Sequence, residues 1–158
     1  MASRKSLIIN SIPRKKNAEG LKGVRFLGLI NEDIFAFSIK SQSNPFRHHK
    51  IYIKLDNLNE LVNNIISNNE TNNLNLIKTA ITTAMTENVR ILCTCEDFLY
   101  SGAMYWNTKN KSGLMDELRP PKPYKKRTLL CKHILFILKN ISRYLTVMAK
   151  ALQLNIEE

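Results

Sequence analysis

The amino-acid sequence predicts an α+β fold, in which a small antiparallel sheet of hairpins packs against helices. Four short runs are rich in β-branched and aromatic residues, which is typical of strands; they are residues 24–30, 34–40, 50–55 and 89–95. Three longer segments repeat apolar residues every three or four positions, as helices with one buried face do; they are residues 56–67, 74–88 and 129–154. With 158 residues, 44% of them hydrophobic, the chain can bury a core of its own.

The first two strand-like runs form a predicted hairpin, because a turn-like tripeptide at 31–33 separates them. In the third run every second residue from Ile51 to Leu55 is apolar, so one face of this strand should be buried. The polar segment before it contains a proline, and we expect its His48 and His49 to lie in a surface loop.

Two helices are predicted between the third and fourth strands. The first should start at a cap formed by Asp56 or Asn57, and its apolar stripe consists of Leu58, Leu61, Val62, Ile65 and Ile66. The second should end near Asn88, and its apolar side consists of Leu74, Ile77, Ile81 and Met85.

The C-terminal segment predicts one long helix. Its apolar residues alternate in spacings of four and three, and they are Ile134, Leu138, Ile141, Leu145, Met148 and Leu152. This stripe can lie on the core of its own domain. Alternatively, because ~20 helical residues reach ~30 Å, the part formed by Ile141, Leu145, Met148 and Leu152 can extend beyond the domain and meet another chain.

Positive charge is concentrated in two blocks. The chain has 24 Lys and Arg against 13 Asp and Glu, a formal net charge of +11. Residues 1–25 carry a net +6, and residues 119–143 carry +8 without an acidic residue. Such blocks favour an anionic partner, either a nucleic acid backbone or an acidic protein face, although they can also serve solubility alone. The candidate contact residues are Arg4, Lys5, Arg14, Lys15, Lys16, Arg119, Lys122, Lys125, Lys126 and Arg127.

All three cysteines and one of the three histidines fall into two matched pairs. Cys93 and Cys95 form C-x-C on a predicted strand, where both sulfurs leave on one face. Cys131 and His133 form C-x-H at the start of the last helix. Three thiolates and an imidazole suit Zn²⁺, and four protein ligands make a closed, structural site. The alternative is a set of ordinary buried thiols and a helix histidine, but two matched pairs with no thiol left over favour one structural Zn²⁺.

The pattern C-x-C-xn-C-x-H, with one pair on a strand and the other entering a helix, resembles the SWIM-type zinc finger. This resemblance implies zinc-ligand roles for Cys93, Cys95, Cys131 and His133, in a family associated with binding DNA or protein. The spacer of 35 residues between Cys95 and Cys131 is longer than the family's usual one.

The flanking segments are similar to those of small SWIM-like proteins encoded by tailed bacteriophages. The segments that carry this similarity are VRFLGLI, CTCEDFLYSGAMYWNTKN, RPPKPYKK and LLCKHILFILKN. Glu96 departs from the pattern, because a proline commonly follows the second cysteine in those proteins. The similarity implies a virion or structural component rather than an enzyme.

The chain divides into three predicted segments. Residues 1–22 are a basic extended N-terminal arm, residues 23–92 an α+β body, and residues 93–158 a zinc-pinned ββα element with a basic loop and the C-terminal helix. Aromatic residues in the loop can stack on nucleic acid bases, but we expect Phe98, Tyr105 and Trp106 to form a small core beside the zinc. The proline-stiffened stretch at 119–127 is better suited to present a contact surface.

These features favour a non-enzymatic function. No free cysteine remains as a nucleophile, and no phosphate-binding glycine loop or Ser-His-Asp pattern is visible. We therefore expect an architectural subunit of a larger assembly, a tailed-phage virion component of the head, neck or tail region. Its partners would be other protein subunits, in an oligomer, without a membrane or a small-molecule substrate. The alternative is an autonomous SWIM-type nucleic-acid-binding protein that uses the basic arm and the 119–127 loop.

The distribution of apolar residues predicts neither a signal peptide nor a membrane span. The N-terminal apolar run at 7–9 is too short for a signal-peptide core, and no apolar stretch approaches the ~20 residues of a membrane span. We expect the protein in the virion after assembly in the host cytoplasm or, if it is not viral, in soluble intracellular form.

Overall fold

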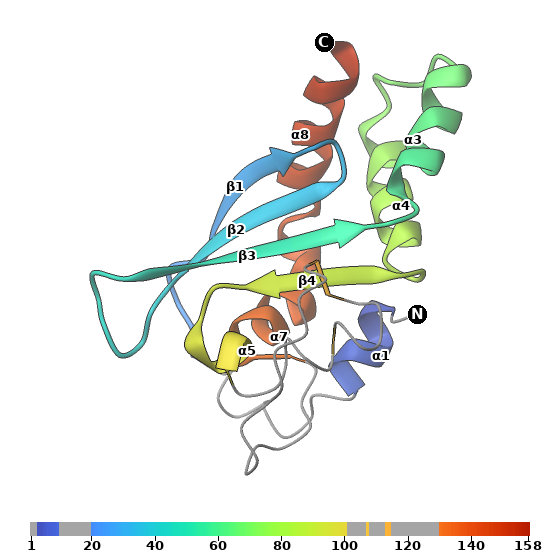
Figure 1. Ribbon diagram of the computed structural model, residues 1–158. Coiled ribbons are helices and arrows are strands. Elements are labelled where there is room, and N and C mark those ends of the chain that lie inside the picture. Colours follow the sequence, from blue (N-terminus) through green and yellow to red (C-terminus); the bar gives the residue numbers. More distant parts are fainter. Residues whose placement is uncertain (1–2, 10–19, 101–106, 108–112, 115–129) are drawn as a thin grey trace.

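A four-stranded antiparallel sheet in the order β1-β2-β3-β4 forms one layer of the fold (Figure 1). The computed structural model describes residues 3–9, 20–100, 107, 113–114 and 130–158. Its strands are β1 (Arg25–Ile30), β2 (Ile34–Lys40), β3 (His48–Leu55) and β4 (Val89–Cys93). The predicted α+β class and all four predicted strands are confirmed.

Alternation along β3 shows which face of the sheet is covered. His49, Ile51, Ile53 and Leu55 are buried, whereas the residues between them are exposed or partly exposed. Successive side chains of a strand point to opposite faces, so this buried face is the one against the helices. Aligned pairs on the neighbouring strands, such as Ile51 with Cys93 of β4, continue the same buried face.

The β1–β2 turn is tight and adopts left-handed backbone angles. Asn31 and Glu32 have φ values of 50° and 69°; asparagine tolerates this region better than most residues do. Asp33 then pairs with Lys54 of β3 at 3.4 Å between Oδ2 and Nζ. The predicted hairpin is therefore confirmed, with its turn at 31–33.

Helices α3 (Leu58–Ser67) and α4 (Leu74–Ala84) connect β3 to β4, as predicted. Asn73 caps α4, because its side-chain oxygen accepts a hydrogen bond from the Leu76 N–H at 3.1 Å. The side-chain cap predicted for α3 is not formed: Asn57 occupies the cap position without a side-chain hydrogen bond. Asp56 instead accepts a hydrogen bond from the Asn88 amide at 2.6 Å, which ties the start of α3 to the start of β4.

The N-terminal stretch is not extended throughout, contrary to the prediction for residues 1–22. Arg4–Ile9 form helix α1, and Leu7 is fully buried in the core. The Arg4 Nε–H donates to the Leu138 carbonyl at 2.8 Å, and the Arg4 backbone N–H donates to the Met85 carbonyl. These contacts to distant segments hold a helix that is too short to be stable alone.

The C-terminal segment is helical, as predicted, but it is interrupted. It consists of α7 (Lys132–Lys139), a 3-10 turn η2 (Ile141–Arg143) and α8 (Leu145–Glu157). Both the backbone N–H and the side-chain amide of Asn140 donate to the Phe136 carbonyl. An asparagine that competes for carbonyls in this way favours a helix end.

The apolar stripe of this segment packs on the chain's own core. Ile141, Met148 and Leu152 are at most 2% exposed, and Leu145 packs partly buried against the same core. The alternative prediction, that these side chains extend beyond the domain and meet another chain, is therefore wrong for Ile141, Met148 and Leu152. Figure 1 shows α8 running behind the sheet and beside α4.

None of the helices within the described residues has the length and apolar character needed to cross a membrane.

Candidate metal centre

The first pair of predicted ligands lies where β4 passes into a short helix, α5 (Glu96–Tyr100). Cys93 is the last residue of β4, and its side chain lies on the buried face of the sheet. The strand ends there, so the prediction that Cys95 also lies on it is wrong. The Cys95 sulfur accepts a hydrogen bond from the Phe98 N–H at 3.3 Å, and its carbonyl accepts from Leu99. Cys95 thus begins α5 as a capping residue does.

The second pair lies at the start of α7, as predicted. Cys131 occupies the N-cap position with extended backbone angles (φ −78°, ψ 167°). Its carbonyl accepts a hydrogen bond from the Leu135 N–H at 3.1 Å, so His133 lies in the first turn. A cap followed by a helical turn thus places both side chains at the same helix end.

The four side chains converge on one buried point. Cys93, Cys95, Cys131 and His133 are between 0 and 3% exposed, and their donor atoms all lie within 4.8 Å of one another. The Cys93 sulfur is 4.0 Å from His133 Nδ1. In a tetrahedral zinc site, bond lengths of ~2.3 Å to sulfur and ~2.0 Å to nitrogen place donors ~3.5–3.8 Å apart. Shifts of ~1 Å or less would therefore close the cluster on an ion.

The electrostatics of the thiols also fit a cation. Burial raises the pKa of Cys93 and of Cys131 well above the ordinary value. Hydrogen bonds from the Cys131 and Cys93 thiols lower the pKa of Cys95 strongly, against the effect of its own burial. The two neighbouring thiols thus favour the thiolate form of Cys95, and a cation at the centre would favour the thiolate form of all three.

His133 supports the same reading. Its Nε2 is buried and has no hydrogen-bond partner among the described residues, while Nδ1 faces the Cys93 sulfur. Nδ1 is therefore the ring nitrogen that could bind an ion together with the three sulfurs, and such an ion would not itself satisfy Nε2. The four residues thus form a cluster that could hold a metal ion, compatible with a zinc finger.

His49 is a neighbour of this cluster that the sequence did not predict. It was expected in a surface loop, but it lies in β3 and is only 8% exposed. Its ring centroid is 4.7 Å from that of His133, with 42° between the ring planes. Burial lowers the pKa of His49, and the nearby His133 adds to this effect. The signal was available, because residue 49 continues the buried alternation of residues 51, 53 and 55; His48 is exposed, as expected.

The other predicted contact residues are only partly described. Lys5 is exposed on α1. Arg4 is half-buried, and its side chain holds α1 to the Leu138 carbonyl within the same chain. The remaining predicted cations lie outside the described residues, as do the aromatic residues Tyr105 and Trp106; these cations are Arg14, Lys15, Lys16, Arg119, Lys122, Lys125, Lys126 and Arg127. Phe98 is fully buried beside the cluster, as predicted.

Comparison with known proteins adds no further identification: no protein-family model, curated protein or solved structure matches the chain.

Proposed function

We propose that this chain is a non-enzymatic, zinc-stabilised architectural subunit of a larger assembly. The observation that carries the proposal is the closed donor set of Cys93, Cys95, Cys131 and His133, all of them buried. Catalytic zinc sites keep one position open for water or substrate, whereas four protein ligands fill the coordination sphere. Zinc bound here would supply folding free energy by joining β4 and α5 to α7.

The SWIM-like pattern of the ligands and flanks refines the proposal. It favours a virion component of a tailed phage, located in the head, neck or tail region and joined to other protein subunits. Zn²⁺ is the proposed ion, because three sulfurs and one nitrogen form a soft donor set that hard cations such as Mg²⁺ and Ca²⁺ avoid.

The charge of the chain supports a second candidate, a nucleic-acid-binding protein. A net charge of +11 in 158 residues suits a polyanion, and counterion release would make such binding strongly dependent on salt. In this case the chain would act alone on DNA or RNA instead of joining protein subunits.

Metal analysis and sizing test the proposal. The purified full chain should contain one zinc per chain, and sedimentation should show multimers, or association with particle proteins, without added DNA. A zinc-loaded monomer whose size changes only when DNA is added would refute the architectural role and favour the second candidate. Metal-free protein of unchanged stability would refute the zinc site.

A further inference from the structure

The connection between β2 and β3 exposes an aromatic ring at its tip. Phe46 is 94% exposed, more than the other large apolar side chains among the described residues. The hairpin that carries it extends past the end of the sheet at the left of Figure 1. Aromatic side chains are enriched in protein interfaces, where they act as anchors.

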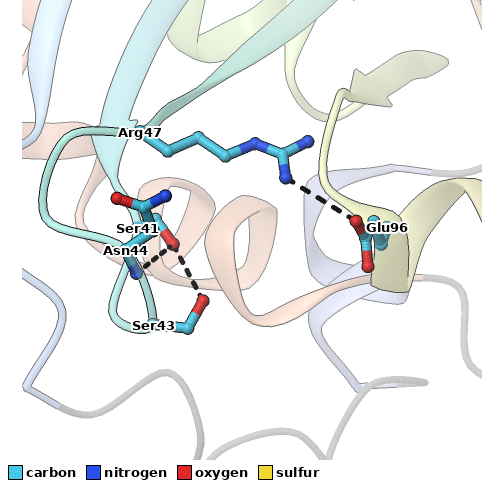
Figure 2. A network of polar contacts seen from close by, with 5 residues as sticks. All are labelled: Ser41, Ser43, Asn44, Arg47 and Glu96. Atoms are coloured by element: carbon cyan, nitrogen blue, oxygen red, sulfur yellow. Dashed lines mark hydrogen bonds and ion pairs between the residues drawn. The ribbon is translucent and has the colours of Figure 1, made fainter.

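The backbone around this ring is held in place by polar contacts (Figure 2). The Ser41 hydroxyl accepts a hydrogen bond from the Asn44 N–H at 3.3 Å. The Asn44 side chain in turn accepts a hydrogen bond from the Phe46 N–H at 3.0 Å. Arg47 forms an ion pair with Glu96 of α5 at 3.6 Å. These contacts favour one conformation of the loop, which lowers the conformational entropy that it loses when it binds a partner.

A groove between α3 and α4 is suited to accept such a ring. It has a volume of about 210 Å³, and its apolar lining consists of Leu61, Ile65, Leu76 and Ala80. Protein cavities of roughly 150 Å³ can hold a benzene ring, so the groove is large enough for a phenyl group. Its polar lining includes Glu70, Thr79 and Thr83.

The segments that contain the two features differ in charge. Residues 34–55, which form the β2–β3 hairpin, include four Lys or Arg and no Asp or Glu. Residues 56–88, which contain α3 and α4, include four Asp or Glu and one Lys. Two of the hairpin cations are already paired within the chain, Arg47 with Glu96 and Lys54 with Asp33. The complementarity therefore comes from Lys40 and Lys50 of the hairpin and from Glu70 of the groove, and opposite charge directs two surfaces toward each other.

We propose that Phe46 of one copy of this chain inserts into the α3–α4 groove of a second copy. This inference rests on the proposed architectural function and names one neighbour in the assembly, a further copy of the same chain. The hairpin tip and the two helices lie at opposite sides of the fold in Figure 1, so the contact is head-to-tail. Such a contact closes into a ring or continues as a filament.

Sedimentation velocity of the zinc-loaded full chain tests the contact, at concentrations up to about 500 µM because a small interface binds weakly. The tip variant is Phe46→Ser and the groove variant is Thr83→Trp, which fills the groove from an exposed position. Each should weaken self-association at least about 30-fold, the loss expected for an interface hot spot. Leu27→Ser, at a β1 residue that is 52% exposed, is the matched control and should associate like the wild type.

Mixing the two variants gives a second readout. The Phe46→Ser chain keeps an intact groove and the Thr83→Trp chain keeps an intact tip, so the mixture should form pairs that grow no further. Circular dichroism should show that both variants are folded.

Three results would overturn the inference. The first is a mixture that stays monomeric although the wild type associates. The second is association of both variants at wild-type strength, which would leave the architectural function standing on another surface. The third is a wild type that stays monomeric over the whole range; the sizing experiment with DNA then decides separately about the architectural function. Loss of DNA binding by Phe46→Ser in such a monomer would assign the tip to nucleic acid instead.

Discussion

Binding of Zn²⁺ to this chain should release two thiol protons. Burial raises the pKa of Cys93 and Cys131, so both thiols keep their protons at neutral pH in the metal-free protein. Hydrogen bonds from these two thiols lower the pKa of Cys95, so we expect it to be a thiolate before the ion binds. Since thiolates are the form that binds zinc, the ion must displace one proton from Cys93 and one from Cys131.

The number of protons fixes the pH dependence. With two protons released, the apparent affinity for zinc should rise about 100-fold from about pH 7 to pH 8, or about 2.7 kcal/mol. The sign follows from the raised pKa values, because a higher pH removes the protons with which the ion competes.

Competition with a chromophoric chelator at several pH values in this range measures the slope. Calorimetry in two buffers of different ionisation enthalpy counts the protons independently. Three released protons would show that Cys95 enters as a thiol, against the hydrogen bonds described above. One proton or none would show that Cys93 and Cys131 are not both ligands.

Three further predictions address the site and the fold. Cys131→Ser removes a thiolate ligand and should lower the Tm of the zinc-loaded chain by more than about 10 °C in thermal denaturation; an unchanged Tm would contradict a structural site. His49→Ala should weaken zinc binding about 10-fold and alter the visible spectrum of the Co²⁺-substituted protein, because the ring no longer positions the imidazole next to it. His49→Phe keeps a ring at this position and should restore most of the zinc affinity and of the Co²⁺ spectrum. Zinc affinity and a spectrum unchanged in His49→Ala would contradict a positioning role for the ring. Asn73→Ala removes the cap on the Leu76 N–H and should cost about 1 kcal/mol of stability, whereas Asn75→Ala should cost much less.

Most elements of the fold were predictable because their burial repeats along the sequence. The alternation of Ile51, Ile53 and Leu55 survives in β3, where one face is covered by helices and the other is not. Helix α1 was not predictable in this way. Its six residues are too few for a periodic pattern, and tertiary contacts such as the burial of Leu7 are what stabilise it.

The metal ligands were predictable from spacing, but their local structure was not. A C-x-C pair is compatible with a strand, where both side chains share a face, and equally with a strand end followed by a helix cap. The hydrogen bond from the Phe98 N–H to the Cys95 sulfur shows the second arrangement. His49 was missed because its own side chain is polar, although its position continues the alternation of Ile51, Ile53 and Leu55.

The β2–β3 hairpin also contacts residues next to both ligand pairs. The Lys132 ammonium, between Cys131 and His133 in sequence, donates to the Gln42 side chain at 2.6 Å. Glu96 follows Cys95 directly and pairs with Arg47 at 3.6 Å, with both side chains more than half exposed. Exposed pairs of this kind contribute only ~0–1 kcal/mol, so they orient the loop without fixing it strongly.

A stronger connection between the hairpin and the metal centre must therefore come from buried groups. The rings of His49 and His133 meet inside the fold, at 4.7 Å between centroids, and His49 is only three residues from Phe46 in the sequence. A metal ion that fixes His133 would limit the positions open to His49, and through β3 those of the exposed ring. A structural ion in this place thus has a use beyond holding α7 to β4, because it would keep the surface that we propose for self-association in one conformation.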